Sequence, residues 1–143
     1  MKLKDKDQVK KWLRNLTLIK REMRLKIDFY NTLIDDFTRL SVSDERLREL
    51  KPEFNTYLTA ASNIEFYRSE IDKCRNKYNN ILNDWNRLSE LLDSDEVMVV
   101  TAKYLKGITW DAMEFSVFFS RRQCFRIMDR AVEKLVGQTV GEW

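Results

Sequence analysis

Apolar side chains recur at alternating steps of three and four residues through most of the first 92 positions. The first run is Val9, Trp12, Leu16, Ile19, Met23, Lys26, Tyr30, Leu33, Phe37 and Leu40, of which all but Lys26 are apolar or aromatic. The second run is Tyr57, Ala60, Ile64, Tyr67, Ile71, Cys74, Tyr78, Ile81, Trp85, Leu88 and Leu92. We call these two runs the seam. Such spacing is typical of helices that pack along one stripe, as in a coiled coil. It predicts helices over residues 6–40 and 53–92.

A short polar connection, SVSDERLRELKP, separates the two predicted helices. Ser43 and Asp44 are candidate caps, and Pro52 suits a first helical turn. Two helices of similar length with a short connection pack most simply as an antiparallel hairpin. Residues 1–92 are therefore predicted to form a hairpin coiled coil for oligomerisation or partner binding. The spacing leaves open whether the seam closes within one chain or between chains.

The last third of the chain predicts three short helices. Their caps and ends are marked by Asp93, Ser94, Asp95, Gly107, Thr109, Ser120 and Gly137. Side chains of Asp, Ser and Thr cap helix starts, and glycine ends helices. Residues 93–143 are thus predicted as a small C-terminal helical domain. With only 3 glycines and 1 proline for turns, the whole chain is predicted to be all-α.

Charge is distributed unevenly. Residues 1–40 carry 11 Lys/Arg against 6 Asp/Glu, residues 41–100 carry 8 against 12, and residues 101–136 carry 7 against 4. Two basic ends therefore flank an acidic middle. This is compatible with nucleic-acid contact at either end, or with ordinary solvated helix faces. The net charge of +3 alone is too small to indicate a partner.

Several classes of protein are disfavoured by what the sequence lacks. There is no histidine, and Cys74 and Cys124 lie far apart, so no metal or other cofactor is expected and both cysteines are interpreted as reduced packing residues. The sequence contains neither a glycine-rich phosphate loop nor a nucleophile with a base at interpretable spacing, so an enzyme is disfavoured. No long apolar run predicts a membrane span, and the charged start MKLKDKDQVKKW is not a secretory signal.

The last predicted helix has two contrasting faces. Its apolar face is Cys124, Phe125, Ile127, Met128, Ala131, Val132 and Leu135, and its polar side is Arg121, Arg122, Gln123, Arg126, Asp129, Arg130 and Glu133. Cations in a first turn oppose the helix dipole, so Arg121 and Arg122 indicate an external anion such as DNA phosphate. Arg can also read guanine, and Gln adenine. The alternative is a solvated face of a structural domain.

Residues 100–135 also resemble a known motif. The matching positions, in register without a gap, are Tyr104, Gly107, Thr109, Trp110, Met113, Ser120, Arg122, Gln123, Arg126, Ile127, Ala131, Val132, Lys134 and Leu135, with Val117 in a leucine slot and Cys124 in a valine slot. The segment resembles the helix-turn-helix of sigma-factor region 4. It is also similar to the small phage transcriptional regulators of the RinA/ArpU type, which share this helix-turn-helix.

The resemblance implies a phage-type transcriptional regulator that binds promoter DNA in the cytoplasm of a bacterial host. Its expected partners are double-stranded DNA and further copies of itself, as a homodimer or higher oligomer, with RNA polymerase as another candidate. The residues carried over are Ser120, which caps the recognition helix, Arg121, Arg122, Gln123, Arg126 and Arg130, which face DNA, and Lys106, Thr109 and Trp110 near the backbone entry. Trp110 is interpreted mainly as a core residue.

Two positions depart from the family's pattern. Glu114 replaces a small alanine, and Phe118 occupies a turn slot often filled by glycine. Because an unpaired buried carboxylate is costly, either Glu114 is turned to the edge and paired, with Arg121 or Lys103, or the motif helices are splayed. A domain that keeps the fold but binds protein is therefore an alternative. It is favoured by the aromatics expected to be exposed, Phe115, Phe118, Phe119, Trp12 and Trp143.

Overall fold

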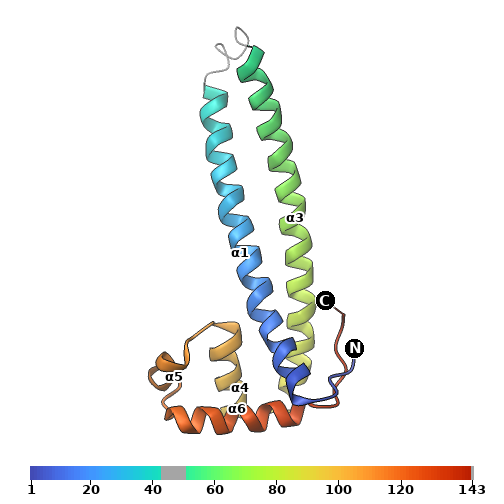
Figure 1. The fold of residues 1–143 in the computed structure, drawn as a ribbon, viewed down its shortest axis with the longest axis vertical. Coiled ribbons are helices and arrows are strands. Elements are labelled where there is room, and N and C mark those ends of the chain that lie inside the picture. The colour runs from blue at the N-terminus through green and yellow to red at the C-terminus, as the bar shows by residue number, and fades with distance from the viewer. Residues whose placement is uncertain (43–50, 143) are drawn as a thin grey trace. The chain divides into compact units, whose positions relative to one another are not determined.

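The computed structural model describes residues 1–42 and 51–142, and all its regular elements there are helical (Figure 1). They are α1 (Lys6–Val42), α3 (Lys51–Ser89), α4 (Ser94–Val100), the π-helical turn η1 (Thr101–Leu105), α5 (Trp110–Val117) and α6 (Arg121–Leu135). The all-α class is confirmed, and both long helices begin and end close to the predicted residues. Pro52 lies in the first turn of α3, whereas Ser43 and Asp44 fall outside the described residues.

Contacts divide the chain into two compact units. The first unit comprises residues 1–20 and 77–143, and the second comprises residues 21–76. This division differs from the boundary predicted at residue 93, since the ends of both long helices belong with α4, α5 and α6. The physical reason is burial: the apolar sides of the short helices share one core with seam residues of α1 and α3.

The core of the first unit is built around the seam. Val9, Trp12 and Leu16 of α1, and Ile81 and Trp85 of α3, are all buried. They form one cluster with the apolar face predicted for the last helix, of which Cys124, Ile127, Met128, Ala131, Val132 and Leu135 are buried. The expectation that Trp12 is exposed was wrong, because its place in the seam puts the indole in this core. Phe119, also expected to be exposed, is half-buried against the core, and Trp143 lies outside the described residues.

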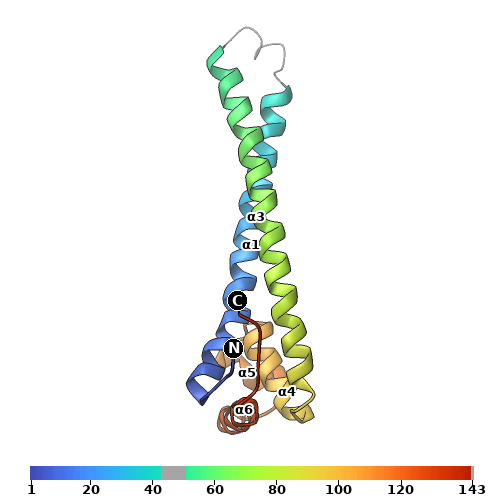
Figure 2. The ribbon, with the colours of Figure 1, turned by 90° about the vertical axis from the view of Figure 1, so that its right-hand side faces the viewer.

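The two end segments of the chain close one side of the same core. Lys2 and Thr139 form an isolated antiparallel bridge, and the amide of Leu3 donates to the carbonyl of Gln138 at 2.8 Å. Both views place these segments beside one another (Figure 2). Leu3 and Val140 are buried here. The pairing therefore adds an apolar cover that the heptad pattern alone does not provide.

The helical stretch that follows α3 is not a uniform α-helix. After α4, residues Thr101–Leu105 form a π-helical turn, closed by the amide of Lys106 on the carbonyl of Thr101 at 2.9 Å. Two side chains of α1 donate to backbone carbonyls at the end of this turn. Thr17 donates to the carbonyl of Tyr104 and Lys20 to the carbonyl of Leu105, each at 2.7 Å. A π turn holds more residues than an α turn.

The residues that face the core differ from those that a regular α-helix would bury. A regular α-helix would place Val97, Val100, Thr101 and Tyr104 together on one inward side. In the structure Val99, Val100 and Ala102 are the buried apolar residues of this stretch, while Val97, Thr101 and Tyr104 are only partly buried. Gly107 ends the stretch with a φ of +71°, as its glycine identity predicted.

The second unit is a pair of helices, the α1 and α3 segments within residues 21–76. Phe29 meets Tyr67 edge-on at 4.8 Å between ring centroids, and Lys26 Nζ lies 3.5 Å from Glu70 Oε2. Since residues later in α1 meet residues earlier in α3, the two segments run antiparallel. Cys74 is buried in the seam, as predicted.

Lys26 is the polar member of this seam. Its ammonium group lies 3.0 Å from Glu22 and donates to the Cys74 sulfur at 3.4 Å. The hydrogen bond to Glu22 is the main cause that raises the pKa of Lys26 above its ordinary value, and burial opposes it. A single lysine in an apolar seam fixes the register of the two helices at a cost in stability.

Candidate nucleic-acid interface

Two short helices joined by a tight turn form the part of the first unit that the sequence singles out. The hydroxyl of Thr109 accepts a hydrogen bond from the amide of Ala112 at 3.3 Å and so caps α5. Ser120 caps α6: its hydroxyl accepts from the amide of Gln123 at 3.2 Å, and Gln123 Oε1 accepts from the amide of Ser120 at 3.0 Å. Both caps predicted from the sequence are confirmed.

A row of three arginines follows the exposed side of α6. Arg122, Arg126 and Arg130 recur every fourth residue, so they follow one side of the helix over roughly 12 Å. All three are exposed. Within the described residues no carboxylate lies within 4 Å of their guanidinium groups. We call these three residues the arginine row.

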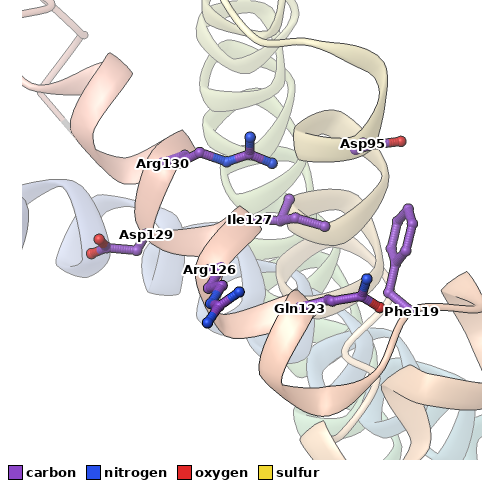
Figure 3. A pocket seen from close by; sticks show the side chains of 7 residues that line it. All are labelled: Asp95, Phe119, Gln123, Arg126, Ile127, Asp129 and Arg130. Carbon is purple, nitrogen blue, oxygen red and sulfur yellow. The ribbon is translucent and has the colours of Figure 1, made fainter.

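The acidic residues of α6 are neutralised from another helix. Lys6 of α1 lies 3.2 Å from both Asp129 Oδ1 and Glu133 Oε1. The hydrogen bond to Asp129, followed by the one to Glu133, raises the pKa of Lys6. The side chains of Asp129 and Arg130 point away from each other, although both line one groove (Figure 3). The pairing with Lys6 therefore leaves the arginine row without a carboxylate partner on α6 itself, and the charge of Arg130 acts instead on Asp93, whose pKa it helps to lower.

Arg121 differs from the arginine row because it has a partner within the protein. Its Nη1 donates to Asp111 Oδ1 at 3.0 Å, and its guanidinium lies 5.7 Å from the ring centroid of Phe125. The carboxylate of Asp111 is almost fully exposed, so this ion pair is open to exchange with an external anion. Glu114, which replaces a small alanine of the family's pattern, is exposed and not buried. The carboxylate paired with Arg121 is that of Asp111.

An open groove of about 510 Å³ runs beside the arginine row. Its lining is Asp95, Phe119, Gln123, Arg126, Ile127, Asp129 and Arg130 (Figure 3). Ile127 forms an apolar floor, and Phe119 is half-buried against the core. Its charged residues are Arg126 and Arg130, Asp95 in the first turn of α4, and Asp129, which is paired with Lys6. The groove therefore has arginines and aspartates in equal number around an apolar base.

The residues predicted near the backbone entry lie at the start of α5. Lys106 and Thr109 are exposed. Trp110 packs against the core, with its ring 4.6 Å from that of Phe125 and with Lys103 Nζ 4.8 Å from its centroid. The interpretation of Trp110 as a core residue is confirmed. Its packing on Phe125 connects the starts of α5 and α6.

One buried carboxylate was missed at the sequence level. Glu96 is fully buried, and its Oε1 accepts hydrogen bonds from Lys134 Nζ and from the amide of Asp93. Its other oxygen has no hydrogen-bond partner among the described residues. The hydrogen bond to Glu96 raises the pKa of Lys134. The spacing Asp93–Glu96 is a capping-box signal, but the pairing with Lys134 joins α4 to α6 and has no local signal.

Other kinds of site have little support in the described residues. No group of three or more Cys, Asp or Glu converges there on a position that could hold a metal ion. None of the helices described is both long and apolar enough to cross a membrane. Cys124 is buried as predicted, and its burial raises the pKa of the thiol.

Comparisons of this chain with protein-family models, with curated proteins and with solved structures find no match.

Proposed function

We propose that this protein is a non-enzymatic DNA-binding regulator in which α6 enters the major groove of duplex DNA. The observation that carries the proposal is the arginine row, three exposed cations without a carboxylate partner on the same side of one helix. The acids of that helix are paired with Lys6. Exposed arginines without a carboxylate partner add little to the stability of the fold. The phosphate backbone of DNA supplies the missing negative charge.

The roles of the polar residues differ in this proposal. Arg122, Arg126 and Arg130 contact phosphates or guanine edges. Gln123 uses its carbonyl oxygen in the helix cap, so only its amide N–H groups are free to donate. A two-point contact with adenine needs both groups. Base reading therefore falls to the arginines, and Gln123 serves first to fix the start of α6.

The wider role as a phage-type transcriptional regulator rests on the resemblance of residues 100–135 to sigma region 4. The order α5, turn, α6, with Ser120 at the helix start, supports a helix-turn-helix arrangement. On this proposal Lys106 and Thr109, exposed at the start of α5, lie near the DNA backbone. RNA polymerase is a second partner that the same resemblance supplies.

Selection of bound sequences from random duplex DNA tests the proposal. We expect one motif to be enriched by the wild-type chain at low salt. Arg122→Ala combined with Arg126→Ala should reduce binding to that motif, by about 1–3 kcal/mol for each arginine that reads a base. Arg21→Ala combined with Arg24→Ala is the matched control, because it removes the same charge from exposed residues of the second unit. Equal binding by all three proteins would contradict the proposal.

A second function, self-association, is favoured by apolar residues on the second unit. Leu25 is 69% exposed, and Phe29 and Phe66 are also largely exposed. Phe29 and Phe66 both contact Tyr67, so the two rings belong to one patch. We take the partner to be a second copy of this chain, because helix-turn-helix proteins bind two half-sites as dimers. The patch lies beside the seam, on the same two helices, α1 and α3.

Light scattering at two concentrations tests self-association. We expect a mass that exceeds the 17.3 kDa of one chain and that rises with concentration. Leu25→Glu combined with Phe29→Glu should return the protein to one chain, because a charge in a buried contact is costly. Asn31→Glu is the control, because Asn31 is exposed on another side of the same helix. A wild-type protein that stays at one chain throughout would exclude the self-association.

A further inference from the structure

Phe118 combines two features that are unfavourable in the isolated protein. Its backbone is left-handed, with φ 59° and ψ 27°, and it is the one non-glycine residue with positive φ in the described ranges. This conformation crowds Cβ against the following carbonyl oxygen. Its side chain is 89% exposed, so packing of the ring within the protein does not offset the strain.

Phe115 extends the same surface. It lies three residues earlier, in the last turn of α5, and it is 79% exposed. Neither ring takes part in the aromatic pairs found among the described residues. The turn thus presents two unpartnered aromatic rings to the surroundings.

The turn that carries Phe118 leads directly into cations. Phe119 packs against the core, Ser120 caps α6, and exposed Arg121 and Arg122 follow. A ligand that meets this surface has to carry negative charge and, next to it, an apolar group. Duplex DNA has both, because the 5-methyl group of thymine lies in the major groove between the phosphate backbones.

We propose that Phe118 contacts a thymine methyl group at the start of α6 and so determines part of the sequence specificity, with Phe115 widening the contact. The inference rests on the proposed function, since the arginine row brings α6 to the groove. Phosphate contacts position a protein without reading sequence, whereas a contact with the thymine methyl group distinguishes bases. Phe118 is therefore a specificity-determining residue, separate from the charges that provide affinity.

The experiment removes the methyl group without changing the base pair. In the duplex enriched by the full-length protein, each thymine is replaced in turn by deoxyuridine. We expect one replacement to weaken wild-type binding about fourfold, the worth of one buried methyl group. Phe118→Gly should bind the thymine duplex more weakly and be indifferent to that replacement.

The variants are chosen so that folding does not confuse the result. Glycine adopts positive φ without strain, so Phe118→Gly should keep or raise the Tm. Phe118→Asn is a second variant without a ring that tolerates this backbone conformation. Leu91→Ala, which shortens another exposed apolar side chain of the first unit, is the control and should discriminate between thymine and deoxyuridine as the wild type does.

The outcomes separate this inference from the proposed function. If the wild type binds but is indifferent to every deoxyuridine, or if Phe118→Gly discriminates as the wild type does, the assignment of Phe118 is overturned and DNA binding by the arginine row stands. If no duplex is enriched at all, the proposed function fails and the inference fails with it.

Discussion

The same heptad spacing gives different burial in the two units. In the first unit the seam residues Leu16 and Ile81 are almost fully buried, because α4, α6 and the end segments surround them. In the second unit Ile71 and Cys74 are buried, but Leu33 and Ile64 are only half-buried. Two helices alone cover one side of each seam residue. The heptad pattern therefore predicts which residues face a neighbour, while the number of neighbours decides how much each one contributes.

The largest effect should come from a cavity made in each unit in turn. Leu16→Ala removes a fully buried side chain and should lower the free energy of unfolding by about 2–5 kcal/mol. Leu33→Ala, at a half-buried seam position of the same helix, should cost about 1 kcal/mol. Urea unfolding followed by circular dichroism measures both. Equal losses would show that something covers the second unit as completely as the first.

The next effect concerns Glu96, the buried carboxylate of the first unit. Glu96→Ala removes one half of the capping box and leaves Lys134 without its closest partner. We expect a loss of about 1–3 kcal/mol in the free energy of unfolding. Glu90→Ala, at an exposed acid a few residues earlier, is the control and should change little. A null result for Glu96 would mean that its pairing adds no stability.

Acid should weaken both units through different carboxylates. The backbone hydrogen bond from Glu96 is the main cause that lowers the pKa of Asp93 from 3.8, and the hydrogen bond from Lys73 is the main cause that lowers the pKa of Glu70 from 4.5. Since both pKa values are lower in the folded protein, the two carboxylates stabilise the fold at pH values above their ordinary pKa values. This stabilisation is lost as the pH falls through the folded-state pKa.

Unfolding curves between pH 7 and pH 3 measure this dependence. Asp93→Asn should flatten the loss in the first unit, and Glu70→Gln should flatten it in the second. The stabilising roles of Asp93 and Glu70 would be contradicted if the protein lost stability above pH 7 and kept it in acid.

The smallest effect tests the acid that faces the arginine row. Asp95 lines the groove together with Arg126 and Arg130. Asp95→Asn removes a charge that repels phosphate, so DNA affinity should rise about two- to threefold at low salt. Asp28→Asn makes the same change of charge on an exposed residue of the second unit. A rise of equal size for both would indicate a general charge effect without a local site.

Local features of the fold could be predicted from the sequence. The helix bounds follow from the seam, and the caps at Thr109 and Ser120 follow from the chemistry of their side chains. Contacts between distant residues could not be predicted in this way. Lys6 meets Asp129 across 123 positions, and no spacing rule connects residues so far apart.

The candidate site was predicted in part for the same reason. The helical spacing placed Arg122, Arg126 and Arg130 on one exposed side, as the structure has them. The partner of Arg121 and the use of Gln123 in the cap depend on the local geometry of α5 and α6. Residue type gives what a side chain can bind, and geometry decides what it already binds.

The salt dependence of DNA binding tests the central claim most directly, because each phosphate contact changes the slope of log K against log salt by about 0.9. If the arginine row contacts phosphate, Arg122→Ala combined with Arg126→Ala should make the slope shallower by about 1.8. Arg21→Ala combined with Arg24→Ala, on the second unit, should leave it unchanged. Identical slopes for the wild type and both double variants would contradict the assignment of α6 as the DNA-binding helix.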